Sequence, residues 1–400
     1  MNKILLIILD GLGGIANNTL GGRTCLEAAQ TPLMDRFAQE GACGLIKPFM
    51  RKNSFPTSED THFSLFGYDA EQYRIGRGVF EAIGLNIKLD ENSIAWRGNW
   101  ATLDDKGHLV DRRAGRIPVN EDLIAGIKHL TIEGVEFDLY LGQEHRSVLL
   151  MRGEGLSDKV SDGYSRELGV LPPKITALNE DPKSIFTAKI VNEYLEKIHE
   201  LLIDNPINKQ RIDQGFPPAN YILLRGAGSF KKIPSFYELW KRHGACIAGG
   251  YLYRGISKMI GWDIIDVPGA NASVDTNLSG KIQASIKALE DKDFVFCHIK
   301  ATDTLGHNHD CKGKVKFLEK IDESLNPIFD LKNITLIITG DHATPCSTGE
   351  HEDDLIPLLI WGKGVQSDDA IYFGESACAQ GSLGTMEQTQ VLSKIMEITK

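Results

Sequence analysis

The sequence lacks several features that would place it in a specialised class of protein. It has no Cys-x-x-Cys pair, no internal repeat and no low-complexity tract. None of its uninterrupted apolar runs reaches the ~18 residues that a membrane-spanning helix needs. The sequence therefore gives no sign of a paired-cysteine motif, a repeat architecture or a transmembrane protein.

Two further absences concern the cellular compartment. The opening "MNKILLIILDGLGG" is not typical of a signal peptide, because its apolar core is short and Asp10 closes it where a small-residue cleavage site would stand. The 7 cysteines are odd in number and scattered, which favours reduced thiols over a disulfide framework. We expect a cytoplasmic protein.

The composition that is present is ordinary for a soluble globular protein. Hydrophobic residues make up 42% and charged residues 24% of the chain, and 400 residues are too many for one core, so two domains are expected. The net charge of −10 argues against nucleic acid or an anionic membrane as the main partner. It leaves room for a local basic pocket that binds a small anion.

An α/β pattern opens the chain and returns near its end. The unbroken apolar run "KILLIILD" predicts a buried parallel strand, and "TPLMDRFAQEG" predicts a helix with Thr31 as N-cap, Pro32 at the first position and Gly41 just past the end. Later strands are predicted at "DFVFCHIKATD", "NITLIITGDH" and "DLIPLLIWG", and helices at "NLSGKIQASIKALED" and "GKVKFLEKIDESL".

The middle of the chain has a different texture. Alternating stretches such as "HRSVLLMRG" predict half-buried antiparallel strands, and "DPKSIFTAKIVNEYLEKIHELLI" predicts one long amphipathic helix. We therefore expect a discontinuous α/β core, a mostly parallel sheet flanked by helices, formed by residues 1–70 and 238–400. A smaller α+β domain, residues 71–237, is inserted into it.

Chemically capable side chains stand where the core strands stop. In open α/β sheets ligands bind beyond the carboxyl ends of the strands. A single Asp there is usually a turn residue or a cap and a lone His is usually structural, but the joint pattern is harder to dismiss. The residues at or near this edge are Asp10, Asp303, His307, Asp341, His342 and His351, and "PTSEDTHFSLFGYD" adds Ser58.

These ligands predict a pair of metal ions. Oxygen and imidazole ligands without thiolate suit Zn²⁺ or Mn²⁺. Six such side chains plus a serine oxygen are too many for one tetrahedral ion and suit two. Two metals ~4 Å apart are the usual apparatus for in-line phosphoryl displacement.

The motifs resemble those of the archaeal-type, 2,3-bisphosphoglycerate-independent phosphoglycerate mutases of the alkaline phosphatase superfamily. They cover almost the full length: "LLIILDGLGG", "SEDTHFSLFGYD", "GRGVFEAIG", "DRRAGRI", "EHRSVLL", "LLRGAG", "HIKATDTLGHNHD" and "ITGDHATPCSTGEHEDDLIPLLIWG". The resemblance implies an alkaline-phosphatase-like core with an inserted substrate-binding or lid domain. It also implies two divalent ions, with Mn²⁺ the first expectation and Zn²⁺, Co²⁺ or Mg²⁺ as alternatives, and no bisphosphoglycerate.

Carried over by position, the resemblance implies Ser58 as the residue that becomes phosphorylated. The family tends to have Gly-Ser-Asp-Thr-Ala-His around this serine, whereas this chain has Thr-Ser-Glu-Asp-Thr-His. Registering on His62 selects Ser58, with Thr57 and Thr61 close by as alternatives. The implied ligands of one metal are Asp10, Ser58, Asp341 and His342, and those of the other are Asp303, His307 and His351.

A mutase needs more substrate-binding groups than a phosphatase, because the dephosphorylated glycerate must stay bound while it reorients and takes the phosphoryl group back on its other hydroxyl. Cationic side chains that grip its carboxylate are therefore expected, and the planar fork of Arg suits that task, although any one Arg is more often part of a surface ion pair. The candidates are Arg77, Arg112, Arg113, Arg116, His145, Arg146 and Arg225 in the inserted segment, with Arg254 and Lys300 in the core.

The sequence thus predicts an enzyme that interconverts 3-phosphoglycerate and 2-phosphoglycerate through a phosphoserine. Its only expected partner is the small-molecule substrate, and its oligomeric state stays open. The alternatives are a metal-dependent phosphatase or diesterase, a homoserine-kinase-like phosphotransferase of the same superfamily, and a non-catalytic metal-binding protein.

Overall fold

The computed structural model describes residues 2–52, 54–116 and 119–399. The chain divides into two compact units: a first unit of Met1–Arg74 with Ile233–Lys400, and a second unit of Ile75–Lys232. These divisions fall at residues 74/75 and 232/233, against the boundaries of 70/71 and 237/238 expected from the sequence.

The first unit is built on an eight-stranded sheet of order β10-β9-β11-β1-β12-β13-β2-β14. All neighbouring strands run parallel except at β13, which is antiparallel to both β12 and β2. The mostly parallel α/β fold class is therefore confirmed. The strands are β1 (Lys3–Leu9), β2 (Ala42–Lys47), β9 (Gly244–Ile247), β10 (Asp263–Ile264), β11 (Phe294–Ile299), β12 (Ile334–Thr339), β13 (Ile356–Gly362) and β14 (Gly384–Glu387).

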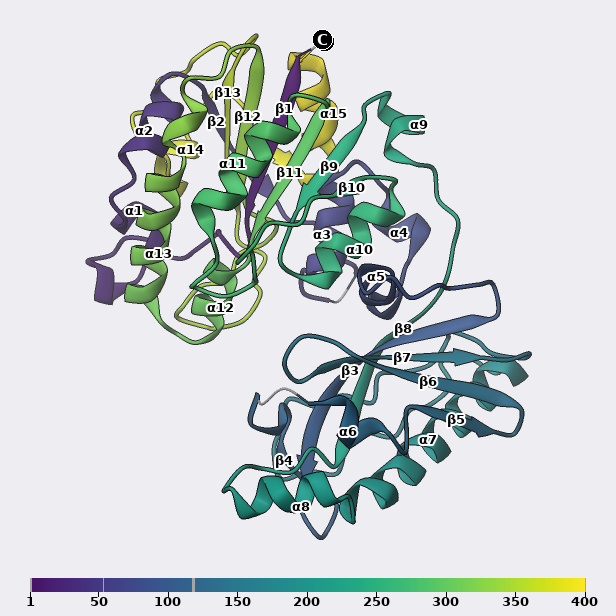
Figure 1. Cartoon of the computed structure of the whole chain (residues 1–400). Helices are drawn as coiled ribbons and strands as arrows, with labels where there is room; N and C mark the ends of the chain where they lie inside the picture. Colours follow the sequence, from purple (N-terminus) through teal and green to yellow (C-terminus); the bar gives the residue numbers. More distant parts are fainter. Residues whose placement is uncertain (1, 53, 117–118, 400) are drawn as a thin grey trace. The chain divides into compact units, whose positions relative to one another are not determined.

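Helices cover both faces of this sheet, which explains the unbroken apolar runs. Figure 1 shows α2, α11 and α13 on one side and α3, α10 and α15 on the other. In β1, Leu5, Ile7 and Leu9 join the core on the side of α2, α11 and α13. The alternating Ile4, Leu6 and Ile8 are equally buried and face the other layer, as the pleat requires.

The helices of the first unit are mostly short. They are α1 (Cys25–Ala28), α2 (Pro32–Gln39), α3 (Ser58–Leu65), α4 (Ala70–Tyr73), α9 (Phe236–Trp240), α10 (Tyr251–Met259), α11 (Leu278–Ala288), α12 (Ala301–His307), α13 (Cys311–Ser324), α14 (Glu375–Cys378) and α15 (Gln388–Ile398). Short 3₁₀ turns lie at Asn18–Leu20 and Asn326–Ile328. No helix in the described part of the chain combines the length and the apolar character that crossing a bilayer requires.

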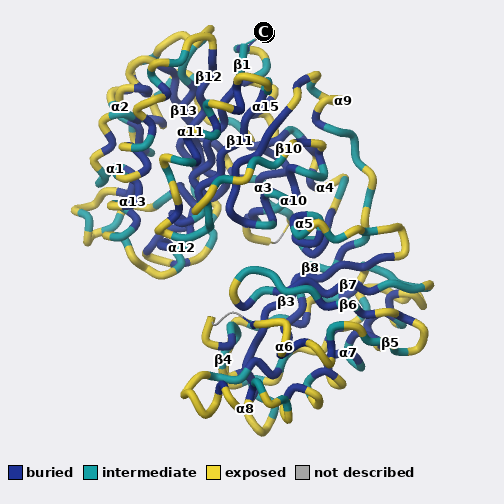
Figure 2. Tube along the Cα trace, viewed as in Figure 1, coloured by how far each residue is buried: buried dark blue, intermediate teal, exposed yellow. Residues whose placement is uncertain are grey.

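The second unit is an antiparallel sheet packed against a long helix. Its strand order is β4-β3-β7-β6-β5, and β8 pairs with β3. Figure 2 shows its strands largely in the dark blue of buried residues. The core joins Trp96, Phe137 and Leu149 of the sheet to Tyr194 and Ile198 of α7. This α+β character agrees with the expectation for the middle of the chain.

The elements of the second unit are β3 (Ser93–Leu103), β4 (Leu109–Asp111), β5 (His129–Ile132), β6 (Val135–Leu141), β7 (Arg146–Arg152), β8 (Tyr221–Ser229), α5 (Arg77–Gly84), α6 (Glu121–Ile124), α7 (Pro182–Ile203), α8 (Pro206–Asp213) and a 3₁₀ turn at Ala114–Arg116.

The start of α2 shows how distant residues complete a local element. Thr31 takes the N-cap position and Pro32 the first helical position, as predicted, but the Thr31 side chain makes no capping hydrogen bond. The carboxylate of Asp322 in α13 accepts hydrogen bonds from the backbone N–H groups of Leu33 and Met34, at 3.1 and 2.7 Å. This carboxylate satisfies donors that the first turn of a helix leaves open.

We predict that Asp322→Ala lowers the free energy of unfolding by about 1–3 kcal/mol, because it leaves buried N–H donors of α2 without an acceptor. Chemical denaturation measures this loss. Glu323→Ala is the matched control, since Glu323 is exposed on the same helix and its removal should change stability by less than about 0.5 kcal/mol. Equal losses in the two variants would contradict the capping role of Asp322.

Candidate metal centre

The parallel register of three strands brings the predicted ligands to one edge of the sheet. β1 lies between β11 and β12, and Ile8 pairs with both His298 and Thr339. The three strands therefore end level with one another. The residues that follow them carry the acidic groups: Asp10 after β1, Asp303 in α12 after β11, and Asp341 after β12.

A first group of side chains surrounds the imidazole of His342. Its Nε2 lies 3.6 Å from Asp10 Oδ1, 3.2 Å from Asp341 Oδ2 and 3.5 Å from Ser58 Oγ. All four residues are buried, with at most 3% of any of them exposed. The donor atoms of Asp10, Asp341 and His342 lie within 4.8 Å of one another, which is close enough to share one ion.

A second group lies beside the first and shares His342 with it. The donor atoms of Asp303, His342 and His351 also lie within 4.8 Å of one another. His351 Nε2 is 3.5 Å and His307 Nε2 is 3.4 Å from Asp303 Oδ1. The His342 and His351 rings stack at 3.7 Å between centroids. All six predicted ligand side chains and Ser58 therefore gather in one place.

In His307, His351 and His342 the Nδ1 atom makes a hydrogen bond, which leaves the lone pair of Nε2 available to bind a metal ion. The Nδ1 of His307 donates to Gly349 O at 2.6 Å, and that of His351 to Pro56 O at 2.8 Å. The Nδ1 of His342 lies 3.1 Å from the hydroxyl of Thr344, which itself donates to Asp303. Each Nε2 lone pair thus faces carboxylate oxygens, and these acceptors repel one another unless a cation lies between them.

The unpaired Oδ2 atom of Asp341 and the balance of buried charges also indicate that the site fits a cation. Asp341 Oδ1 accepts the backbone N–H of Gly11 at 3.0 Å, whereas its Oδ2 is buried and has no hydrogen-bond partner among the described residues. Lys300 Nζ lies 2.8 Å from Asp10 Oδ1 and 2.5 Å from Asp303 Oδ2. One ammonium cannot balance three buried carboxylates, so the residues fit divalent cations.

The pKa shifts follow from this imbalance. Burial would raise the pKa of Asp10 and of Asp303, but the Lys300 ammonium holds both below their usual range. Burial and the negative charge of Asp10 raise the pKa of Asp341 well above its usual value. Burial, followed by the neighbouring His351, lowers the pKa of His342, which therefore stays neutral as a metal ligand must.

Ser58 stands at the first position of α3 and is the hydroxyl best placed for chemistry. Thr57 is the N-cap, and its hydroxyl accepts from Asp60 N at 3.4 Å. The Thr61 hydroxyl donates to Thr57 O at 2.9 Å, so both neighbouring hydroxyls serve the helix. The N-terminal end of α3 favours negative charge, which suits a phosphorylated Ser58.

In the second unit, basic side chains gather around one buried carboxylate. Arg77 Nε lies 3.4 Å and Arg97 Nε 3.8 Å from Glu81 Oε1. The strand register places Arg97 opposite Arg225 in β8, and Asn99 of β3 opposite Arg146 in β7. Like charges on facing strands repel, so this arrangement favours a bound anion. These side chains form an arginine cluster: Arg77, Arg97, Arg146 and Arg225 around Glu81.

The same arginines lower the pKa of the buried His145. Its pKa falls to about 3 because of burial and then the charges of Arg146, Arg97, Arg116 and Arg225. For Glu81, burial would raise the pKa, but Arg97, Arg77 and Arg146 hold it below its usual value. The charges of these arginines thus act on both His145 and Glu81.

The remaining substrate candidates lie in other settings. In the "DRRAGRI" segment, Asp111 accepts the backbone N–H groups of Arg113 and Gly115, each at 2.7 Å, and this fixes the turn. Arg112 and Arg113 are half-buried, Arg116 is exposed, and Ile117 is outside the described residues. Arg254 in the first unit pairs with Asp266 at 2.7 Å. Lys300, also predicted to contact the substrate, lies in the first unit and contacts the candidate metal ligands Asp10 and Asp303.

Comparison with known proteins shows the family of the chain. The chain matches the metalloenzyme superfamily model over residues 2–398. It is 40% identical to 2,3-bisphosphoglycerate-independent phosphoglycerate mutase 1 of Methanocaldococcus jannaschii, with 99% of this chain and 97% of the relative covered. It is 41% identical to the 2,3-bisphosphoglycerate-independent phosphoglycerate mutase of Thermoplasma volcanium, with 100% and 97% covered.

The chain belongs to the 2,3-bisphosphoglycerate-independent phosphoglycerate mutases of the metalloenzyme superfamily.

Solved structures show the same relationship. A protein of Pyrococcus horikoshii superimposes with a TM-score of 0.84 at 33% identity, covering 100% of this chain and 97% of the other. The cofactor-independent phosphoglycerate mutase of Thermoplasma acidophilum gives a TM-score of 0.69 at 34% identity, covering 100% of both chains.

Several supporting residues of this mutase-family centre were missed by the sequence interpretation. Tyr253 donates its hydroxyl proton to Asp10 Oδ2, and His298 Nε2 donates to the same oxygen at 2.9 Å. The Thr344 hydroxyl donates to Asp303 Oδ1 at 2.8 Å. His298 was visible as a lone polar residue inside the apolar run of β11. Arg97 was similarly visible inside "AWRGNW", whereas nothing local pointed to Tyr253.

The backbone of Gly11 lies very close to Thr344 and Asp303 of this centre. Its φ is +64°, and a Cβ on it would lie 2.5 Å from Thr344 Oγ1 and 2.9 Å from Asp303 Cβ. Any side chain there would displace the residues that hold Asp303. Gly21 has a similar φ of +69° but nothing within 4 Å of the position of its Cβ.

We predict that Gly11→Ala weakens Mn²⁺ binding at least tenfold and lowers stability by about 2–4 kcal/mol, from left-handed backbone strain plus overpacking. Isothermal titration calorimetry and denaturant unfolding measure the two effects. The matched control, Gly21→Ala, carries only the backbone strain of about 1–2 kcal/mol and should keep its Mn²⁺ affinity. Unchanged Mn²⁺ affinity in Gly11→Ala would show that the packing around Asp303 is not needed.

Proposed function

We propose that this chain interconverts 3-phosphoglycerate and 2-phosphoglycerate without a bisphosphoglycerate cofactor, through phosphorylation of Ser58. The observation that carries the proposal is the position of Ser58 Oγ, buried at the N-terminus of α3 and 3.5 Å from His342 Nε2 within the candidate metal centre. The names of the full-length relatives support the same reaction and do not favour a phosphatase or a homoserine-kinase-like enzyme.

The candidate ligands are assigned as two sets. Asp10, Ser58, Asp341 and His342 are proposed for one ion, and Asp303, His307 and His351 for the other, with His342 close to both. Divalent ions bound there would lower the pKa of the serine hydroxyl and neutralise the charge of the transferring phosphoryl group. Mn²⁺ is our proposed ion, because hard oxygen and imidazole ligands without thiolate suit it.

The residues of the site have separate roles in this reaction. Ser58 supplies the oxygen that accepts the phosphoryl group, and the first turn of α3 directs backbone N–H groups toward the negative charge that forms there. Lys300 balances Asp10 and Asp303, while Tyr253 and His298 fix the orientation of Asp10 by donating to its Oδ2. The centre is thereby held rigid before substrate binds.

The arginine cluster of the second unit is proposed to bind the phosphoglycerate. An isomerase must hold the dephosphorylated glycerate until its other hydroxyl is phosphorylated, and carboxylate and phosphate oxygens are the ions that Arg side chains bind best. Arg146 Nε is buried and has no hydrogen-bond partner among the described residues, so the guanidinium is available for a ligand. We assign the second unit a substrate-binding role on this basis.

We also propose a cytoplasmic location. All seven cysteines of the chain are free thiols, including several close to one another. Such thiols are typical of a reducing compartment. The expected place of a glycolytic mutase is the same.

The decisive experiment is an enolase-coupled assay on the chelated protein before and after addition of Mn²⁺. We predict that activity with 3-phosphoglycerate returns with Mn²⁺, and that Ser58→Ala lowers it by about 10³-fold or more because no acceptor oxygen remains. Thr61→Val is the matched control, since it removes a neighbouring hydroxyl that only bonds the helix backbone. Steady release of inorganic phosphate, or full activity of Ser58→Ala, would contradict the proposal.

A second prediction tests the arginine cluster. Arg146→Met should raise KM for 3-phosphoglycerate about 10–100-fold, the value of one or two charge-assisted hydrogen bonds. Steady-state kinetics measure this change. Arg152→Met is the control on the same strand, because Arg152 is already ion-paired with Asp138. The assignment fails if both variants keep the KM of the unaltered protein or if both change alike.

A further inference from the structure

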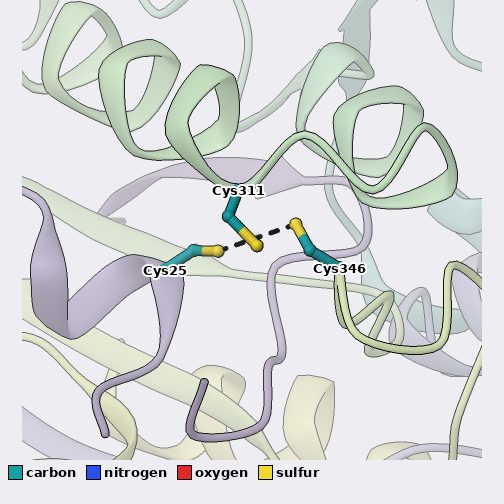
Figure 3. A group of neighbouring side chains, drawn as sticks. All are labelled: Cys25, Cys311 and Cys346. Carbon is teal, nitrogen blue, oxygen red and sulfur yellow. Dashed lines mark hydrogen bonds between the residues drawn. The ribbon is translucent and has the colours of Figure 1, made fainter. Parts of the chain in front are cut away.

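Three cysteines from distant parts of the sequence meet inside the first unit. Cys25 begins α1, Cys311 begins α13, and Cys346 lies in the segment between β12 and β13. Their sulfur atoms all lie within 4.8 Å of one another. Figure 3 shows the three side chains pointing toward a common centre from three different segments. We call these residues the thiol cluster.

The spacing of the sulfurs suits shared coordination better than a disulfide. Cys25 Sγ and Cys346 Sγ are 3.7 Å apart. Two thiolates bound tetrahedrally to one ion, with metal–sulfur bonds of ~2.3 Å, stand about 3.8 Å apart. A disulfide requires ~2.05 Å, and it would leave the third sulfur without a role.

Positive charge and a hydrogen-bond donor accompany these sulfurs. Lys314 of α13 is buried, and its Nζ donates to Gly11 O at 2.8 Å and Thr344 O at 3.0 Å. The hydrogen bond with Cys346, together with the Lys314 charge, lowers the pKa of Cys25 below its usual value. Asn17 Nδ2 lies 3.2 Å from Cys311 Sγ as a donor. The hydrogen bond with Cys25 and burial raise the pKa of Cys346, and burial raises the pKa of Cys311, so a bound cation must displace the protons of these two thiols.

Simple packing explains the cluster less well. Cys25 and Cys346 belong to the hydrophobic core, where cysteine often acts as a small apolar side chain. Cys311, however, is half-buried, accepts the Asn17 amide and lies at the edge of that core.

We propose that Cys25, Cys311 and Cys346 form a separate site for a thiophilic divalent cation, of which Zn²⁺ is the natural example. Soft sulfur ligands distinguish this site from the oxygen and imidazole ligands of the metal centre. On binding, each sulfur forms a bond to the ion and releases its proton to solvent, with no change in oxidation state. The half-buried face at Cys311 leaves a fourth position for water.

Such a site would join α1 to two segments that contain or adjoin residues of the metal centre. α13 follows α12, which contains Asp303 and His307, and the segment with Cys346 also contains Thr344 and His351. A cation bound by the three sulfurs would therefore cross-link these segments without contacting the catalytic ligands. The expected consequence is a higher resistance of the first unit to unfolding.

The test uses Cd²⁺, because cadmium–thiolate bonds give a charge-transfer absorption in the ultraviolet that carboxylate and imidazole ligands do not. The full-length protein is reduced, chelated, saturated with Mn²⁺ and then titrated with Cd²⁺. We predict that the absorption saturates near one Cd²⁺ per chain. Cys311→Ala and Cys346→Ala should each weaken Cd²⁺ binding at least tenfold, whereas the buried cysteine of β11, as Cys297→Ala, should leave it unchanged.

A second measurement needs no variant and remains decisive if a variant fails to fold. Cd²⁺ should protect the half-buried Cys311 from alkylation by iodoacetamide, as read by mass spectrometry of the unaltered protein. Absence of the charge-transfer absorption, or equal absorption in Cys311→Ala and the unaltered protein, would overturn the proposal. So would a Cys25–Cys346 disulfide that forms under mild oxidation while Cd²⁺ gives neither absorption nor protection.

Discussion

Asp10, Asp303 and Asp341 are buried at the carboxyl edge of one sheet, and the repulsion among them is the constraint on which the rest of the first unit depends. Lys300 neutralises part of this charge by contacting Asp10 and Asp303. What remains is relieved by a proton on Asp341, whose pKa is raised well above its usual value, or by bound cations, because unpaired charge in a protein interior is costly. The fit of the site to divalent cations is therefore a consequence of its electrostatics.

The surrounding fold converts that unfavourable arrangement into a rigid one. Level strand ends set the spacing of the carboxylates, and backbone carbonyls fix the histidine tautomers from the opposite side. Thr344 links His342 to Asp303 through one hydroxyl, and the Gly11 backbone holds Asp341. Stability gained in the two covered faces of the sheet offsets the cost of this edge.

Local sequence signals were sufficient for β1, β11, β12 and β13 and for the acidic residues that follow the first three, because an unbroken apolar run and the Asp after it are close in the chain. The shorter β2, β9, β10 and β14 were not predicted. Local signals were also insufficient wherever distant segments meet. Asp322 caps α2 through Met34, which is 288 residues away in the chain, and Tyr253 of α10 donates to Asp10, which is 243 residues away. The sulfur of Cys346 meets that of Cys25 without any spacing motif. Strand order and register, which decide such meetings, are not encoded in any local pattern.

The position of β1 also governs the order in which the chain can fold. This first strand lies between β11 and β12, whose residues are contributed by the last third of the sequence. The second unit, by contrast, is one continuous segment, Ile75–Lys232, and all of its strands pair within that segment. During synthesis its residues can therefore form their own core early, while the apolar N-terminal strand must wait for partners that leave the ribosome late. An exposed "KILLIIL" segment during that interval makes the nascent protein a natural client for chaperones.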